Sequence, residues 1–216
     1  LVKFFLFLIR PLWYLIHYNF FLGLVQKYLI KNFKYKNLEF IIDYERISLA
    51  FSSSFIFNTY EYNDRVLVEK YITEKNKSII IGGGIGFIAS INYKKSSNKF
   101  IISEIDQTII NTLNKNLIRN KCIFELIEGN LLVKKNSDYE DFFINKNFLA
   151  NSKYLNKNSQ KKKIKNYQII DIENYNEYNT LIIDGEGIEE HFVENLNYLP
   201  EIEHIFFELH LDILKK

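Results

Sequence analysis

Apolar residues along this chain gather in short runs that are separated by longer amphipathic segments. Four runs, at residues 78–81, 100–103, 180–183 and 205–207, are rich in Ile, Leu and Phe, and a fifth at residues 122–127 is less regular. Runs of this length are typical of buried β-strands. Because longer segments separate them, the pattern predicts an α/β fold whose sheet is mostly parallel.

Two of the intervening segments have helical periodicity. In residues 106–119 the apolar positions recur at intervals of three and four, which predicts a helix with one buried face. Asp106 stands where an N-terminal cap is expected. Residues 60–74 have a similar spacing directly before the first strand. The apolar face of the helix at 106–119 consists of Ile109, Ile110, Leu113 and Leu117.

Two further regions have weaker patterns. Residues 38–42 and 47–51 predict two short strands, joined as a hairpin around residues 44–46. Residues 133–166 are polar and repetitive, and we predict that they form an exposed insertion between elements of the sheet. The lysine run at residues 161–163 is interpreted as part of a solvated loop, with a patch for an anionic substrate or membrane surface as the alternative.

Residues 1–30 are unusually apolar. Lys3, Arg10 and His17 interrupt them at intervals of seven, so no stretch reaches the roughly 18 uncharged residues of a bilayer span. A helix with so narrow a polar stripe has to be buried in a lipid interface, in a partner or on its own domain. Packing on the domain and peripheral contact with the inner face of a membrane both remain open.

Composition and charge narrow the class of protein. With 216 residues, 47% hydrophobic and 25% charged, the chain has the profile of a globular protein. We expect a helical appendage at residues 1–35 and an α/β domain at residues 36–216. The net charge of +2 is too small to suggest a nucleic-acid partner. Cys122 is the only cysteine, so no internal disulfide can form and a reducing, cytoplasmic location is expected.

The run of glycines after the first strand carries the most chemical information. Residues 82–84 are all Gly, Gly86 follows, and Phe87 begins a predicted helix. A strand, a tight glycine turn and a helix N-terminus together bring a backbone close to a nucleotide, and a Cβ would block that approach. Glu104 ends the next strand about twenty residues later, where an acid can accept hydrogen bonds from both ribose hydroxyls. The pair predicts a nucleoside-bearing cofactor.

The predicted cofactor site combines this turn with the ends of two strands. Asn130 follows the third strand and is a candidate for hydrogen bonding to the adenine edge. For Glu104 the alternative is a structural role as an acid at a helix N-terminus, where it favours the helix dipole. The candidates for cofactor binding are Gly82, Gly84, Gly86, Glu104 and Asn130.

Acids also follow the last two strands. Asp184 and Glu186 come directly after the fourth, and Glu208 and His210 end the fifth. In a parallel sheet these ends meet at one edge, so they open on the crevice that would hold the cofactor. Such groups include candidates for a general base. Coordination of a divalent cation by their oxygens is the less favoured alternative, and no metal-binding residue is assigned. Glu189 is interpreted instead as an acid in the first turn of a helix.

In order and character these segments resemble the FkbM-type methyltransferases, which use S-adenosylmethionine. The resemblance covers about residues 55–210, and its most specific element is the Asp-x-Glu-Gly-x-Glu motif at residues 184–189. The other matched elements are Tyr60-Glu61, Ile85-Gly86-Phe87, Glu104, the pair Asn116 and Asn120 on one helix, and Glu208-x-His210. Two positions depart from the family's pattern: Ile80 replaces an aspartate, and the chain ends at Lys216, before the family's final hairpin.

The resemblance implies a Rossmann-like class I methyltransferase fold, with a mostly parallel sheet, helices on both faces and the C-terminal hairpin missing. It also implies S-adenosyl-L-methionine as the cofactor, and methyl transfer to a hydroxyl of a small-molecule, sugar or glycan acceptor or of a secondary metabolite. On this basis Glu61 joins the cofactor-binding candidates. The catalytic candidates that the resemblance implies are Asp184, Glu186 and His210.

Two other functions compete with this one. The glycine run and Glu104-Ile105-Asp106 are also similar to the cofactor motifs of aminopropyltransferases such as spermidine synthase. Against that family, Ile85 stands where it has an aspartate, and residues 184–187 replace its Asp-Ser-x-Asp-Pro strand end. The remaining alternative is a non-catalytic, cofactor-binding module that associates with a membrane.

Overall fold

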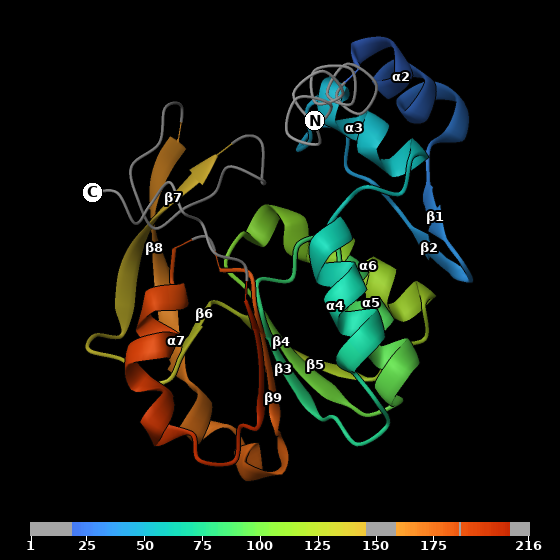
Figure 1. Ribbon diagram of the computed structural model, residues 1–216. Coiled ribbons are helices and arrows are strands. Elements are labelled where there is room, and N and C mark those ends of the chain that lie inside the picture. Colours follow the sequence, from blue (N-terminus) through green and yellow to red (C-terminus); the bar gives the residue numbers. More distant parts are fainter. Residues whose placement is uncertain (1–18, 146–158, 186, 208–216) are drawn as a thin grey trace, which may run out of the picture.

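A five-stranded parallel sheet forms the centre of the computed structural model, which describes residues 19–145, 159–185 and 187–207 (Figure 1). The strands are β3 (Ser78–Ile81), β4 (Phe100–Glu104), β5 (Phe124–Glu128), β9 (Thr180–Ile183) and β10 (His204–Phe207). They are ordered β10–β9–β3–β4–β5, and every neighbouring pair is parallel. The predicted α/β class is therefore confirmed, and the strand order is Rossmann-like.

Three helices cover the first face of this sheet. They are α4 (Tyr62–Tyr71), α5 (Phe87–Ser96) and α6 (Gln107–Arg119), in agreement with the predicted periodicity. Asp106 caps α6 as expected, because its side chain accepts a hydrogen bond from the Thr108 amide. Alternate strand residues such as Ile80 and Ile102 are buried beneath these helices.

The opposite face is covered by α7 (Glu189–Asn195) and by a second, smaller sheet (Figure 1). Ile79 and Ile101, which alternate with the residues of the first face, lie in a separate core on this side. Helices are thus present on both faces, as expected, although a sheet shares the second face with α7. Short 3₁₀ turns connect the elements here: η3 (Ile169–Asp171), η4 (Tyr175–Glu177) and η5 (Leu196–Tyr198).

The second sheet lies where the sequence predicted an exposed insertion. Its strands are β6 (Asn130–Leu132), β7 (Tyr139–Asn145) and β8 (Ser159–Gln168), in the order β6–β8–β7. β8 is parallel to β6 and antiparallel to β7. The prediction of a loop across residues 133–166 is therefore wrong for β7 and most of β8.

The lysine run is part of β8, and its polar sequence concealed a strand with one buried face. Ile164 is buried, while Lys161, Lys163 and Lys165 point to the exposed side. Lys161 pairs with Asp141 of β7 at 2.8 Å between Nζ and Oδ2. Because the neighbouring strand supplies much of the apolar contact, a single apolar position is enough to orient this part of β8.

The hairpin predicted at residues 38–51 is also wrong. The observed hairpin joins β1 (Phe33–Tyr35) to β2 (Leu38–Phe40), and it crosses the domain boundary expected at residue 35. The second predicted strand is instead part of α3 (Leu49–Ile56). Ser48 caps that helix by accepting a hydrogen bond from the Phe51 amide, a local bond that the apolar pattern does not reveal.

The described part of the N-terminal segment forms a short helix. It consists of α2 (Phe20–Val25), continued by one π-helical turn, η1 (Gln26–Ile30). α2 packs against α3 so closely that a Cβ at Gly23 would lie 1.7 Å from the Leu49 carbonyl oxygen. None of the helices in the described ranges has both the length and the apolar character that a bilayer crossing requires.

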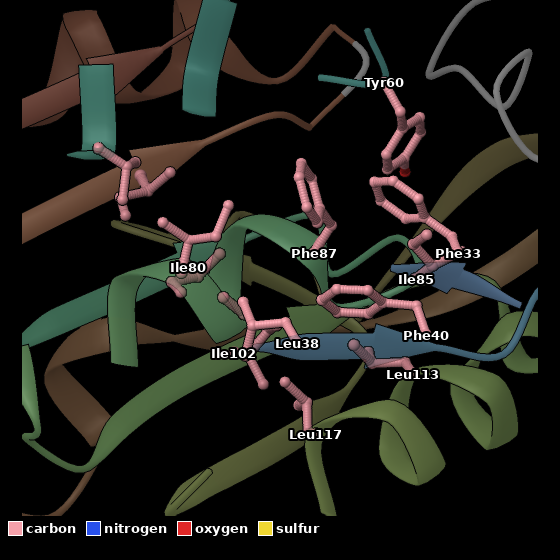
Figure 2. Packing of buried hydrophobic residues seen from close by; sticks show 14 of the residues in the cluster. Phe33, Leu38, Phe40, Tyr60, Ile80, Ile85, Phe87, Ile102, Leu113 and Leu117 are labelled. Carbon is pink, nitrogen blue, oxygen red and sulfur yellow. The ribbon is translucent and has the colours of Figure 1, made fainter. Parts of the chain in front are cut away.

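Aromatic rings join the β1–β2 hairpin to the start of α5 (Figure 2). The ring of Phe87, the first residue of α5, has its centroid 5.1 Å from Phe33, 5.3 Å from Phe40 and 5.6 Å from Tyr60. All four side chains are at most 2% exposed. Burial of such rings makes the hairpin part of the main core, and it fixes the residue that directly follows the glycine turn.

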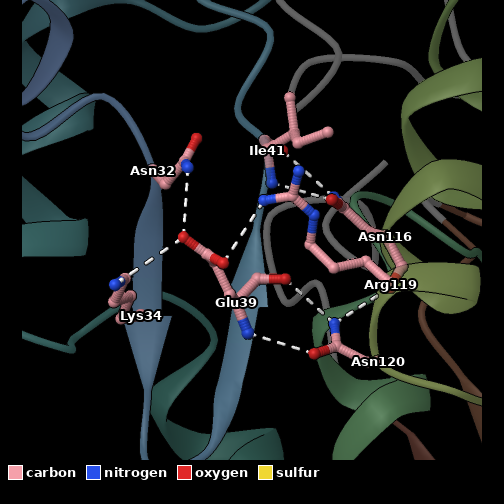
Figure 3. Close-up of polar contacts among 7 residues, drawn as sticks. All are labelled: Asn32, Lys34, Glu39, Ile41, Asn116, Arg119 and Asn120. Atoms are coloured by element: carbon pink, nitrogen blue, oxygen red, sulfur yellow. Dashed lines mark hydrogen bonds and ion pairs between the residues drawn. The ribbon is translucent and has the colours of Figure 1, made fainter.

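Two asparagines of α6 bind the edge of β2 as a neighbouring strand would (Figure 3). Asn120 accepts from the Glu39 amide at 3.0 Å and donates to its carbonyl at 3.1 Å. Asn116 does the same with Ile41, at 2.7 and 3.0 Å, and also donates to the Ile85 carbonyl at 2.9 Å. Four helical residues rise about 6 Å and two strand residues about 6.6 Å, so the two spacings match.

The motif asparagines are therefore expected to contribute mainly to stability. Asn116→Ala leaves three backbone groups without their partner and should lower the free energy of unfolding by roughly 2–4 kcal/mol. Urea denaturation measures this loss. Asn111→Ala, on the exposed side of α6, is the matched control and should cost less than about 0.5 kcal/mol. Equal effects of the two substitutions would contradict the structural role.

Candidate functional site

A pocket lies at the carboxyl ends of β3, β4 and β9, at the crevice where the strand order reverses. Gly82, Gly83 and Gly84 line it beneath the start of α5. The ends of β4 and β9 contribute Glu104 and Asp184. Other polar lining residues include Glu61, Asp64 and Asn130. Apolar lining residues include Ile80, Ile105, Phe142, Ile188 and Phe206.

The glycine turn is held tightly inside the fold. Gly82, Gly84 and Gly86 have φ values of 86°, 49° and 83°. A Cβ at Gly82 would lie 1.9 Å from the Asp184 carbonyl oxygen, and one at Gly83 would lie 2.5 Å from the Leu113 side chain. Internal packing and backbone conformation are therefore sufficient to require these glycines, with or without a ligand.

Glu104 binds the backbone of the glycine turn. Its Oε2 accepts from the amides of Gly83 and Gly84, at 3.0 and 2.9 Å. Its Oε1 accepts from the Asp106 amide at 2.8 Å. Burial raises the pKa of this carboxyl from 4.5 to about 7, while these hydrogen bonds oppose the shift. The predicted alternative, a structural acid before a helix, is therefore part of what Glu104 does, and its ribose contact stays a prediction.

This arrangement disfavours a phosphate in the turn. Amide groups at a glycine turn and a helix N-terminus are the donors that dinucleotide sites offer to a pyrophosphate. Here the amides of Gly83 and Gly84 already bind a buried carboxyl group. A phosphate would have to displace that group and then lie against it.

The lining of the pocket is acidic. Glu61, Asp64, Glu104 and Asp184 all contribute to it, and no Lys, Arg or His is found among its described residues. Burial raises the pKa of the nearby Tyr60 hydroxyl well above its usual value, and the charges of three of these acids, Glu61, Asp184 and Glu104, add to the effect. Such a pocket attracts a cation and repels an anion.

The acids do not form a metal centre in the described ranges. Those ranges contain no group of three or more His, Cys, Asp or Glu side chains arranged to hold a metal ion. One charged group beside the pocket is already neutralised, because Arg46 forms an ion pair with the buried Asp106.

Asn130 has an unused hydrogen-bond acceptor beside the pocket. Its Nδ2 donates to Asn166 Oδ1 at 3.0 Å, but its buried Oδ1 has no partner. A buried acceptor without a donor is costly in a folded protein. A ligand amino group could satisfy it, which fits the predicted contact with the adenine edge.

The structure brings most of the sequence-predicted residues together. Gly82, Gly84, Glu61, Glu104, Asn130 and Asp184 all line the one pocket. Gly86 lies instead against α6, where a Cβ would be 3.1 Å from Leu113. Glu186 and His210, the other two catalytic candidates, lie outside the described residues.

Glu189 has the structural role that its position suggested. Its carboxylate oxygens accept from the amides of Gly185 and Gly187, at 3.2 and 2.9 Å. Glu189 therefore binds backbone amides of the glycine turn after β9, in the same way that Glu104 binds those of the turn after β3. Its interpretation as an acid in the first turn of α7 is confirmed.

Asp64 is the pocket acid that sequence reasoning missed. It is in the first turn of α4, three residues after Glu61. Residues three apart share a helix face, so this spacing was the available signal. Glu61 itself has φ 44° and ψ 41°, a left-handed conformation that is strained for a residue with a long side chain. Strain of this kind is concentrated at functional sites.

Comparison with known proteins assigns no family. The chain matches no protein-family model, no curated protein and no solved structure. The resemblance to the FkbM-type methyltransferases therefore depends on its motifs alone. Any proposed function has to be supported by the geometry of the pocket.

Stability should fall as the pH rises through about 7. The raised pKa of Glu104, about 7 instead of 4.5, means that the folded protein binds more protons than the unfolded chain between these values. The stabilising effect of that proton is complete below the unfolded pKa and is lost above the folded pKa. Urea unfolding at several pH values measures the slope.

Two variants identify the group that titrates. Glu104→Gln cannot ionise and should lose this part of the pH dependence. Glu74→Gln, at an exposed acid before β3, should retain it. An unchanged slope in Glu104→Gln would show that another group is responsible.

Proposed function

We propose that this chain is an S-adenosylmethionine-dependent methyltransferase that binds its cofactor in the acidic pocket. The observation that carries the proposal is the lining of the pocket, which has four carboxyl groups and no cationic side chain among its described residues. The amides of Gly83 and Gly84, which could otherwise bind a phosphate, already donate to Glu104. S-adenosylmethionine is a nucleoside with a sulfonium, an ammonium and no phosphate. A dinucleotide cofactor has the opposite charge.

The residues of the pocket suit the separate parts of this cofactor. Asn130 offers its unpaired acceptor to the adenine amino group. Glu104 lies at the strand end where an acid accepts from ribose hydroxyls. Ile80 stands where the resembling family has an aspartate, and Glu61 and Asp64 supply negative charge to the same pocket for the ammonium and sulfonium groups.

Methyl transfer asks little of the protein beyond position and proton removal. When bound, the cofactor would supply an electrophilic methyl group. Asp184 lines the pocket at the end of β9, where a carboxylate can accept the proton of an acceptor hydroxyl as its oxygen bonds to the methyl carbon. Loss of the methyl group to that oxygen would leave the cofactor as a neutral thioether. Glu186 and His210 remain proposed members of the acceptor site, for a small molecule or glycan.

One observation favours a second candidate, an aminopropyltransferase. No cationic side chain among the described lining residues is available to pair with the carboxylate of S-adenosylmethionine. The decarboxylated form lacks that carboxylate and carries more positive charge, which an acidic pocket favours. The two candidates differ in the cofactor that binds more tightly.

A panel of ligands tests the proposal by calorimetry. S-adenosylmethionine should bind, while NAD⁺ and ATP should not, because their phosphates meet the carboxyl groups of the pocket. Tighter binding of the decarboxylated form would favour the aminopropyltransferase. Binding of NAD⁺ or ATP with equal or higher affinity would overturn the assignment of the pocket to a cationic cofactor.

Glu61→Asn should have opposite effects on stability and on binding. Asparagine tolerates the left-handed conformation, so thermal unfolding should show a gain of roughly 1 kcal/mol. Affinity for S-adenosylmethionine should fall roughly tenfold, because a nearby opposite charge is worth on the order of 1–3 kcal/mol at a partly exposed site. Ser97→Asn, at φ 58° after α5, is the matched control: it should stabilise similarly and leave binding unchanged. Unchanged affinity in Glu61→Asn would remove Glu61 from the cofactor site.

A further inference from the structure

The short helix formed by α2 and η1 exposes a set of large apolar side chains. Phe21 is 74% exposed, Leu29 76% and Tyr28 61%. This α2 face, as we name it, consists of Phe20, Phe21, Val25, Tyr28, Leu29 and Ile30. Scattered apolar residues on a surface need no explanation, but a contiguous group on one element does.

The geometry of the helix separates an inner and an outer side. Gly23 and Gln26 are its buried residues, and Gly23 is the point of closest approach to α3. Phe21 and Val25 are four residues apart in α2, and at 3.6 residues per turn this places them on the side away from Gly23. Tyr28 and Leu29 are exposed in the π-helical turn that follows. The apolar side chains are therefore exposed because the packed side of the helix is the opposite one.

The helix is also firmly anchored. Asn19 caps its start by accepting from the Phe21 and Leu22 amides. Gln26, which is 1% exposed, donates to the Tyr44 hydroxyl at 3.1 Å and to the Asn32 carbonyl at 3.3 Å. The α2 face is thus held in place by buried hydrogen bonds, and its exposure does not come from a frayed end.

The charged residues of this helix and of the chain on either side of it are all positive. Lys27 and Lys31 belong to or directly follow the helix, and the sequence has no Asp or Glu before Glu39. Six Lys and Arg residues occupy that acid-free stretch. A second copy of the chain would bring a like charge to the contact, whereas an anionic surface would be attracted.

We propose that the α2 face docks on an anionic lipid bilayer. A short helix whose exposed residues include Phe, Tyr, Leu and Ile, with lysines among them, has the composition of an interfacial helix, which lies in the plane of the membrane. Each lysine near such a surface adds attraction to anionic headgroups. Figure 1 shows α2 at the same end of the molecule as the carboxyl ends of the central strands, so docking brings the pocket towards the membrane.

A fluorescent label on the face tests this in the full-length chain. Leu29→Cys provides the thiol. Burial raises the pKa of the native Cys122 to about 11, so that thiol reacts slowly at neutral pH. The emission of an environment-sensitive label at residue 29 should shift to shorter wavelength with phosphatidylglycerol-containing vesicles, and much less with pure phosphatidylcholine. The same label at Val193→Cys, a position on α7 that is 60% exposed, should not shift.

Vesicle flotation gives an independent measurement. Leu29→Glu should lower the bound fraction on anionic vesicles by roughly tenfold, since a buried apolar side chain is lost and a negative charge is added. Val193→Glu should leave it unchanged. Flotation of Leu29→Glu equal to the parent, or a label at residue 29 that never shifts, would overturn the proposal. A shift that appears with rising protein concentration and without vesicles would overturn it in favour of self-association.

Discussion

The backbone of the turn at residues 82–86 has to be satisfied by buried side chains, and much of the fold follows from that constraint. The turn is packed between the end of β9 and α6, with no room for a Cβ at Gly82 or Gly83. Glu104 therefore accepts from two of its amides, and Asn116 donates to the Ile85 carbonyl. Because Asn116 also binds the edge of β2, the same side chain links the turn, α6 and the N-terminal hairpin.

Glu104, whose carboxyl group binds the amides of the glycine turn, also affects the chemistry of the pocket. A carboxyl group has to be close to the Gly83 and Gly84 amides, and it occupies the donors that a phosphate would need. The preference for a cationic, phosphate-free ligand that we propose would in this sense be a consequence of how the backbone is satisfied. Glu189 repeats the arrangement after β9, which makes a carboxylate on a glycine turn a structural device of this fold. A glycine-rich motif alone therefore says less about a ligand than its sequence suggests.

Sequence patterns predicted the elements whose burial is regular and missed those fixed by local bonds. The central strands and α6 have the apolar periods of their structures, so they were found. α3 depends on the Ser48 cap and was taken for a strand, and β8 has one buried apolar position, Ile164, among lysines. For the site, the predicted residues Glu104, Asn130 and Asp184 line the same pocket, since they end or follow neighbouring parallel strands. The structural role of Asn116 and the bonds of Glu104 to the Gly83 and Gly84 amides could not be predicted, because these partners are distant in the sequence.

The small net charge of +2 hides a strong separation of charge. The acid-free stretch before Glu39 holds six of the 28 Lys and Arg residues, so the rest of the chain has an excess of acids. Lys27 and Lys31 beside the α2 face and the acidic pocket are described parts of the same molecule, and they favour partners of opposite sign. A protein organised in this way can approach an anionic surface through one region while it keeps an attraction for a cationic ligand in another. Salt would weaken the attraction of the exposed basic region for an anionic surface more than the attraction of the partly enclosed pocket for a cation. Measurements at different ionic strengths can therefore separate the two attractions.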